Sequence, residues 1–218
     1  YGKNLVGSFY QPDLVISDVA ILKSLSKREI ICGYGEILKH ALISSKKVFG
    51  FLNNYKLKIL NLDSPYIERA ITDSCKIKKI IVQQDEKEKN LRKILNFGHT
   101  FAHAYEAALG YSKKLNHGEA VILGIKSAAK FSVVNKFLLQ KKYNQIESHI
   151  KILNLPNDIK KYFNKKKIPS ILKFMKSDKK NNSSNINLIL LKDIGKPVMN
   201  ANFKIYKIKN FLKKELFN

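Results

Sequence analysis

Apolar positions recur with helical spacing over most of the chain. This spacing predicts helices at about 26–45, 47–60, 64–83, 98–109, 118–137, 140–152, 157–164, 169–177 and 208–217. Ser26 and Glu29 have the form of a capping box, which marks the start of the first helix. Ser64 followed by Pro65 predicts an N-cap with proline at the first helical position, and Gly110 is a typical helix stop.

Apolar runs of strand type occur near the two ends. Residues 14–17 form one short run, and residues 186–191 and 197–206 are expected to pair as a hairpin around a turn at 193–196. The polar stretches 84–90 and 178–185 are expected to be loops. The predicted fold is therefore mainly α, a multi-helical domain with short strand segments near both ends.

Length and composition limit the class of protein. A chain of 218 residues with 44% apolar residues can bury a core without disulfides or metals. No apolar run reaches the roughly 18 residues of a membrane span, and no secretory signal is visible. The two cysteines, Cys32 and Cys75, lie far apart, which excludes a disulfide scaffold and suits a reducing, cytoplasmic compartment. Because the chain begins with Tyr1, we expect it to be part of a longer protein.

The charge balance is strongly basic, with 41 Lys and Arg against 17 Asp and Glu and a net charge of +24. Such a surplus is typical of nucleic-acid binding. However, only Arg28, Arg69 and Arg92 carry the planar fork that base and phosphate recognition favours. The lysines are spread along the whole chain, which favours compositional drift onto solvated faces. A basic pocket for a small anion fits either interpretation.

The histidines give the first chemical signal. His99 and His103 are four residues apart in a predicted helix and therefore share a face, and His117 begins the next helix. Thr100 stands where the glutamate of a His-Glu-x-x-His zinc motif would be. A carboxylate such as Glu36 could complete a three-ligand site. Ordinary half-buried histidines are the alternative, and the spacing leaves both open.

Two further groups of residues are ambiguous by spacing alone. Glu36 can pair along its helix with Lys39 or with His40. The charged segment 85–92 reads mostly as a solvated loop, but Arg92 is a candidate for a planar contact to a carboxylate or phosphate.

Several motifs resemble one known family. The sequence Arg92-x-x-Leu95-Asn96-x-Gly98-His99-Thr100-x-x-His103, followed by His117-Gly118-Glu119-Ala120-Val121, resembles the 3-dehydroquinate synthases. Three other segments agree: Gly2-Lys3-Asn4-Leu5-Val6-Gly7-x-Phe9-x-Gln11-Pro12, Gly33-Tyr34-x-Glu36-Ile37-x-Lys39 and Asp178-Lys179-Lys180. The resemblance runs in order from residue 2 to about residue 198.

The resemblance implies a domain organisation and an activity. In this family an NAD-binding domain precedes a mostly helical metal domain, so residues 1–25 would lead from a missing NAD-binding domain into a metal- and substrate-binding domain at 26–218. The family enzymes are lyases of the shikimate pathway, usually homodimers. They convert 3-deoxy-D-arabino-heptulosonate 7-phosphate to 3-dehydroquinate and phosphate with NAD and Zn²⁺, or Co²⁺. Without its NAD-binding domain, the chain alone is expected to be inactive.

The resemblance also assigns roles to residues by matching position. The implied metal ligands are Glu36, His99 and His117, and the implied catalytic residues are Glu88, a proton acceptor, and His103. The positions matched to substrate contacts are Asn4, Lys39, Lys78, Arg92, Asn96 and Lys179. The positions matched to the surroundings of NAD are Lys3, Ile21, Leu22, Lys23 and Ser24. Cys32 and Ser24 depart from the residues common in the family, and His40 and His149 match nothing functional.

Two alternative functions stay open. One is another NAD- and metal-dependent sugar-phosphate cyclase, which shares fold and cofactors but closes a different ring. Lys78 and Arg92 together favour a substrate that bears a carboxylate. The other is a basic nucleic-acid-binding module, which the spread of the lysines disfavours. We therefore expect a small sugar-phosphate acid as substrate, and neither nucleic acid nor membrane as partner.

Overall fold

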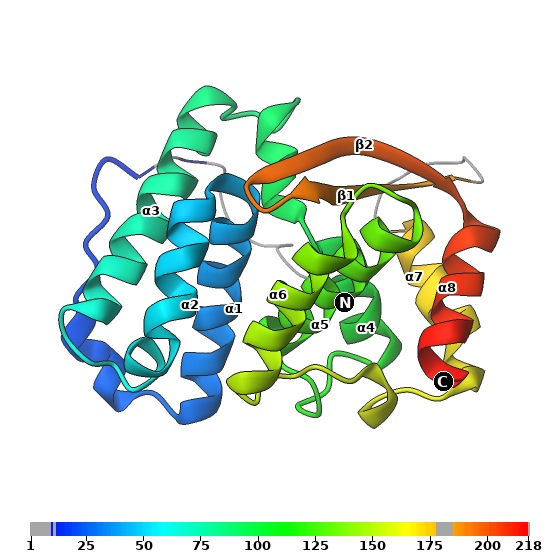
Figure 1. Cartoon of the computed structure of the whole chain (residues 1–218), viewed down its shortest axis with the longest axis horizontal. Helices are drawn as coiled ribbons and strands as arrows, with labels where there is room; N and C mark the ends of the chain where they lie inside the picture. Colours follow the sequence, from blue (N-terminus) through cyan, green and yellow to red (C-terminus); the bar gives the residue numbers. More distant parts are fainter. Residues whose placement is uncertain (1–9, 11, 178–184, 218) are drawn as a thin grey trace.

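The computed structural model describes residue 10 and residues 12–177 and 185–217. This part of the chain is a helical body crossed by one hairpin (Figure 1), as the fold class predicted. Its helices are α1 (Lys27–Ser44), α2 (Lys46–Leu60), α3 (Tyr66–Gln84), α4 (His99–Ala108), α5 (His117–Val134), α6 (Gln140–Ile152), α7 (Ile168–Ser177) and α8 (Ile205–Phe217). Four short 3₁₀ helices are η1 (Val19–Ser24), η2 (Leu91–Asn96), η3 (Ile159–Lys161) and η4 (Lys165–Lys167).

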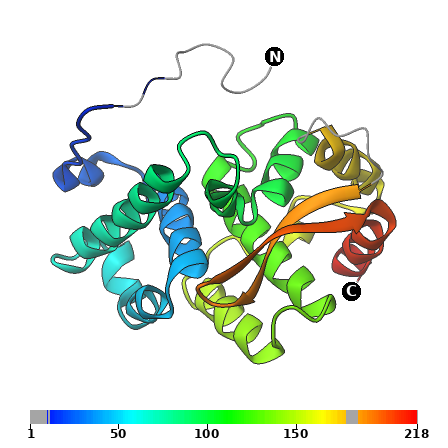
Figure 2. The ribbon, with the colours of Figure 1, turned by 90° about the horizontal axis from the view of Figure 1, so that it is seen from above.

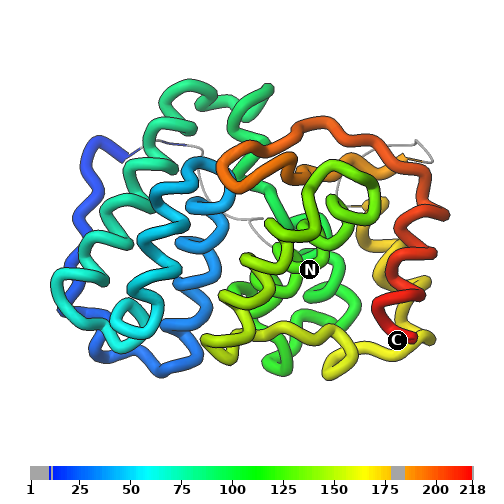
Figure 3. The backbone as a smooth tube through the Cα atoms, viewed as in Figure 1, coloured from blue at the N-terminus to red at the C-terminus, as the bar shows by residue number. Residues whose placement is uncertain are grey.

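Helix α5 is the centre of the body. It packs against α1 and α4 and also contacts α6 and the hairpin, so it joins the group α1–α3 to the group α4–α8 (Figure 3). Its side chains are buried on nearly every face, including Phe131 at 1% exposure. A helix that is apolar all round is typical of a buried central element.

The hairpin lies across one end of the helices. Strands β1 (Asn185–Asp193) and β2 (Lys196–Lys204) pair antiparallel, with Asn185 opposite Lys204 and Asp193 opposite Lys196. The predicted turn is confirmed: Gly195 has a φ of +79° and its N–H donates to the carbonyl of Leu42 at 2.8 Å. This hydrogen bond fixes the turn to the end of α1.

Local start signals explain the helices that carry the site. The predicted capping box is present at α1, where the Ser26 N–H donates to the Glu29 carboxylate at 2.8 Å and the Glu29 N–H donates to Ser26 Oγ at 3.3 Å. At α5 the Asn116 N–H donates to the Glu119 carboxylate at 2.8 Å. These contacts satisfy amide groups that a helix start leaves without partners.

Four element predictions were wrong in detail. Ser64 is not an N-cap, because α3 begins at Tyr66 with Pro65 before it. Residues 157–164 form no α-helix but a 3₁₀ turn, since the side chain of Asp158 accepts from Lys160 N at 2.9 Å and closes a local turn. Tyr206 belongs to α8 instead of the second strand. Residues 14–17 form no strand with any described residue.

The segment before α1 leaves the helical body. Figure 2 shows it running out from the helices, and Leu14, Val15 and Ile16 are 74%, 72% and 81% exposed. An apolar run of this kind is normally buried on both faces within a sheet. Among the described residues nothing covers it. None of the described helices is long and apolar enough to span a bilayer.

Candidate metal and substrate site

Three helices bring one carboxylate and two imidazoles together. Glu36 lies in the middle of α1, and His99 and His117 begin α4 and α5. Their possible ligand atoms all lie within 4.8 Å of one another. His99 Nε2 is 3.6 Å from Glu36 Oε1, and the rings of His99 and His117 are 5.7 Å apart between centroids.

Glycines allow these helices to approach so closely. A Cβ on Gly118 would stand 2.3 Å from the Cα of Cys32 in α1, and a Cβ on Gly124 would stand 2.2 Å from the carbonyl oxygen of Gly98. Gly98 itself has a φ of +80°, which favours glycine, and directly precedes His99. The backbones of α1, α4 and α5 therefore touch where side chains of other residues would separate them.

An ion pair joins two of these helices, α1 and α5, through a partly exposed arginine. Arg28, in the first turn of α1, donates from Nε to Glu119 Oε1 at 2.7 Å and from Nη2 to Glu119 Oε2 at 2.6 Å. Glu119 lies two residues after His117 and also holds the N-terminus of α5. This two-point contact has the bidentate geometry that gives arginine–carboxylate pairs their orientation.

The electrostatics keep Glu36 and His99 in the forms that bind a metal. Lys39 Nζ is 2.6 Å from Glu36 Oε2 and is itself buried. Burial raises the pKa of Glu36, but the charge and hydrogen bond of Lys39 and the nearby His99 outweigh burial and hold that pKa below its usual value. Burial, reinforced by the charge of Lys39, lowers the pKa of His99 to about 3. A carboxylate and a neutral imidazole are both ready to ligate a cation.

The site fits a zinc-type ion by an observation independent of its composition. Glu36 Oε1 is buried and has no hydrogen-bond partner among the described residues. A buried carboxylate oxygen without a partner is costly, and a cation beside it removes that cost. One carboxylate and two imidazoles form a donor set that Zn²⁺ accepts with an open fourth position.

A second cluster overlaps the first and shows a residue that sequence reasoning missed. His103, Glu106 and His117 also place possible ligand atoms within 4.8 Å of one another. Glu106 Oε2 is 2.9 Å from His117 Nδ1. Glu106 follows His99 and His103 by seven and three residues, so all three share one face of α4. That spacing was a usable signal for Glu106.

His103 lies next to the rings of His99 and His117 and belongs to the second of the two clusters. Its ring meets that of His99 edge-on at 5.3 Å and stacks on that of His117 at 6.0 Å. The four-residue spacing left open whether His99 and His103 form a metal pair, and the two clusters place them in different groups, His99 with Glu36 and His117 and His103 with Glu106 and His117.

The candidate substrate residues fall into two places. Lys39 contacts Glu36 directly, and the charge of exposed Lys78, on α3, acts on Lys39. Glu88, Arg92 and Asn96 lie in and before η2, which packs against α1 and α3. Asn4 and Lys179 lie outside the described residues.

The segment around η2 is fixed by one carboxylate. Asp85 accepts from the backbone N–H groups of Lys89, Asn90 and Arg92 at 2.7–3.0 Å. The hydrogen bond from the Arg92 N–H contributes most to holding the pKa of Asp85 below its usual value. Asn96 Nδ2 donates to Glu88 Oε1 at 2.7 Å, so these two candidates are in contact. The Arg92 guanidinium donates to the carbonyl of Glu86.

The described candidate NAD-binding residues lie in one short 3₁₀ helix before α1. Ile21, Leu22, Lys23 and Ser24 lie in η1, where Ser24 Oγ donates to the Ile21 carbonyl at 2.7 Å. Ile21 is 62% exposed. Lys3 lies outside the described residues. The described residues do not bring this group onto the metal cluster.

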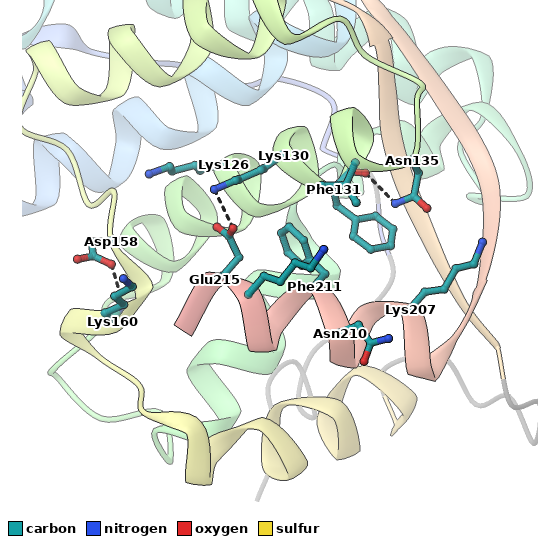
Figure 4. A pocket seen from close by; sticks show the side chains of 12 residues that line it. Lys126, Lys130, Phe131, Asn135, Asp158, Lys160, Lys207, Asn210, Phe211 and Glu215 are labelled. Carbon is teal, nitrogen blue, oxygen red and sulfur yellow. Dashed lines mark hydrogen bonds and ion pairs between the residues drawn. The ribbon is translucent and has the colours of Figure 1, made fainter. Parts of the chain in front are cut away.

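Three open cavities elsewhere do not mark the site. One of about 620 Å³ lies between α5, α8 and η3 (Figure 4). It is bordered by five lysines, Lys126, Lys130, Lys160, Lys207 and Lys214. The other two also have lysine rims, and none of the three includes a histidine. Because the same rim recurs in all three, it reflects the basic surface as a whole.

Solved structures with this architecture define the class of fold. A 2-epi-5-epi-valiolone synthase from Streptomyces hygroscopicus subsp. jinggangensis, with NAD⁺ and Zn²⁺ bound, matches 98% of this chain and 58% of its own, with a TM-score of 0.85 at 20% identity. A 2-deoxy-scyllo-inosose synthase complexed with carbaglucose-6-phosphate, NAD⁺ and Co²⁺ matches 98% of this chain and 59% of its own, with a TM-score of 0.79 at 26% identity. This chain therefore has the fold that these two synthases show over somewhat more than half of their own length.

Sequence comparison gives the family. The family model described as 3-dehydroquinate synthase C-terminal matches residues 33–181, and the one described as 3-dehydroquinate synthase N-terminal matches residues 1–32. The chain therefore belongs to the 3-dehydroquinate synthase family.

Individual relatives agree with this assignment. The 3-dehydroquinate synthase of Pelagibacter ubique is 61% identical over 216 residues, 99% of this chain and 59% of the relative. That of Thermoanaerobacter pseudethanolicus is 40% identical over 195 residues, 89% of this chain and 53% of the relative. The chain thus spans somewhat more than half the length of these curated relatives.

Proposed function

We propose that this chain is the metal- and substrate-binding portion of a 3-dehydroquinate synthase. The whole enzyme would convert 3-deoxy-D-arabino-heptulosonate 7-phosphate to 3-dehydroquinate and phosphate. The observation that carries this proposal is the convergence of Glu36, His99 and His117 from three helices, in a chain of this family. Lys78 and Arg92 favour a substrate that bears a carboxylate over the substrate of a related cyclase.

The proposed metal ligands are Glu36, His99 and His117. A Zn²⁺ or Co²⁺ ion held there would act as a Lewis acid on a substrate hydroxyl, and NAD bound by the rest of the enzyme would accept and return a hydride. Lys39 orients Glu36 through their 2.6 Å contact and keeps it ionised. The low pKa of His99 keeps its imidazole neutral and able to ligate at neutral pH.

The remaining candidate residues would handle the anions and protons of the substrate. Arg92 and Lys78 supply positive charge for the carboxylate and phosphate, and Lys39 adds a buried positive charge beside the ligands. Asn96 orients Glu88, the proposed proton acceptor, through their 2.7 Å hydrogen bond. His103, whose ring stacks on that of His117, is the proposed catalytic histidine beside the metal ligands. Asn4 and Lys179 complete the proposed set of substrate contacts.

The proposal also includes an NAD-binding domain and a second copy of the enzyme. We assign residues 1–25 to the passage from an NAD-binding domain, with Lys3 and residues 21–24 near the nucleotide, and residues 26–218 to the helical domain. The exposed apolar run at 14–16 supports a covering domain, as does the match of residues 1–32 to the family's N-terminal model. A homodimer in the cytoplasm completes the proposal.

The test is phosphate release by the full-length protein. The protein is assayed with 3-deoxy-D-arabino-heptulosonate 7-phosphate, NAD and Zn²⁺, and again after the metal has been chelated. Metal-dependent release with 3-dehydroquinate as product supports the proposal. No release by a folded, metal-loaded and NAD-bound protein would contradict it and favour another cyclase of the same class.

A further inference from the structure

We propose that Glu106 is a positioning residue for the metal centre. By holding His117 at Nδ1, it would present Nε2 of the same ring to Glu36 and His99. This inference rests on the proposed metal site, and it assigns a role to a residue that the sequence motifs left without one.

Burial distinguishes the two partners. The side chain of Glu106 is 5% exposed and that of His117 is 45% exposed. A carboxylate at such depth is costly unless polar or charged groups compensate it, and His117 Nδ1 at 2.9 Å is one such group. Glu106 is therefore placed behind His117, on the protein side of a ring that is itself half exposed.

The chemistry of this contact indicates which nitrogen of His117 carries the hydrogen. The proposal takes Glu106 as ionised. An ionised carboxylate only accepts hydrogen bonds, so Nδ1 of His117 would carry the hydrogen and donate it to Glu106. The lone pair of the neutral ring then lies on Nε2. A carboxylate that accepts from a metal-bound histidine also makes that ring a more basic ligand and restricts its rotation.

The overlapping cluster offers a competing role, in which Glu106 ligates the metal together with His103 and His117. That arrangement would take the nitrogen that now faces Glu106. Two observations favour the positioning role. Glu36 Oε1 is buried without a hydrogen-bond partner among the described residues, whereas Glu106 Oε2 already has one in His117. The ion is therefore expected beside Glu36.

The first arm of the test reads the tautomer of His117 directly. The metal-free full-length protein is labelled with ¹⁵N-histidine, and the ring nitrogens are measured by NMR at pH 8, with His117→Gln used to assign the signals. We expect the Nδ1–H form in the unsubstituted protein. In Glu106→Ala we expect the ring to lose this fixed form, which a merely structural role of Glu106 would not cause.

The second arm measures affinity for Co²⁺ by its visible absorption. Glu106→Ala is expected to weaken Co²⁺ binding by about 10- to 100-fold. Glu106→Gln should lose less, because its amide oxygen can still accept from Nδ1–H. Glu147→Gln is the matched control. It alters a half-buried carboxylate on α6 that contacts Tyr143 of the same helix and Lys126 of α5, and it should leave Co²⁺ binding unchanged.

The outcomes separate the inference from the proposed function. An Nε2–H tautomer in the unsubstituted protein, or unchanged Co²⁺ affinity in Glu106→Ala, would overturn the positioning role. Loss of binding in Glu106→Ala as complete as in His117→Ala, with Glu36→Gln still binding, would make Glu106 a ligand and also overturn it. A Glu106-dependent Nδ1–H tautomer without any Co²⁺ binding would support the hydrogen bond and contradict the proposed metal site.

Discussion

Gly118→Ala tests whether backbone contact between α1 and α5 builds the metal site. The added Cβ would stand 2.3 Å from Cys32 Cα and 2.4 Å from Cys32 O, whereas ordinary contact begins at 3.4 Å. The two backbones must therefore separate by about 1 Å, because neither atom belongs to a flexible side chain. Overpacking of this kind costs about 1–3 kcal/mol of unfolding free energy.

The displacement would also act on chemistry. Gly118 directly follows His117, so the shift moves this ligand away from Glu36 and stretches the contact between Arg28 and Glu119. A misplacement of about 1 Å in a catalytic site can reduce the rate about 100-fold. We expect weaker Co²⁺ binding and a loss in kcat/KM of that order in the full-length protein.

The measurement pairs urea unfolding with Co²⁺ titration, and Gly50→Ala serves as the control. Gly50 lies inside α2 with nothing within 4 Å of an added Cβ. Its replacement should raise the unfolding free energy by about 0.5–1 kcal/mol, because alanine favours helix more than glycine. If Gly118→Ala matched this control in both stability and metal binding, the close-approach explanation would be wrong.

Three other predictions follow from the same contacts. Replacing Arg92 with alanine should lower kcat/KM by roughly 100-fold or more in a steady-state assay, and an unchanged value would remove it from the substrate site. Arg28→Met should lower the free energy of unfolding in urea by about 1 kcal/mol and not more, because the arginine is partly exposed. No loss of unfolding free energy would show that its contact to Glu119 is incidental. Burial lowers the pKa of His149 to about 4, with a smaller effect of Lys56, so the unfolded chain binds a proton there first as the pH falls. The His149 contribution, up to about 3 kcal/mol, is therefore present above pH 6.5 and lost toward pH 4, and His149→Gln should unfold with a weaker dependence on pH over this range.

The sequence was most informative where a feature is local. Helical spacing located α1, α2 and α6, and the Ser26–Glu29 capping box and the Gly195 turn are present where they were predicted. It was least informative where local side chains compete with the helix, as at Asp158, and at the apolar run 14–17, which forms no strand with any described residue.

The site shows the same division. Residue types and spacing offered Glu36, His99, His103 and His117 as a possible metal site, and the family resemblance selected Glu36, His99 and His117 as the ligands. Nothing in their spacing states that three helices meet. Their convergence depends on glycines at Gly98, Gly118 and Gly124, whose effect is a contact between backbones far apart in sequence. Glu106 had a usable helical spacing, but its partner His117 lies on another helix.

The most direct test of the account is the division of the histidines. Metal content and Co²⁺ affinity would be measured for the full-length protein and for His117→Ala, His99→Ala and His103→Ala, together with phosphate release. The account predicts one bound metal, lost in His117→Ala and His99→Ala, and retained in His103→Ala with turnover strongly reduced. Equal loss of metal in all three variants, or full turnover in His103→Ala, would contradict it.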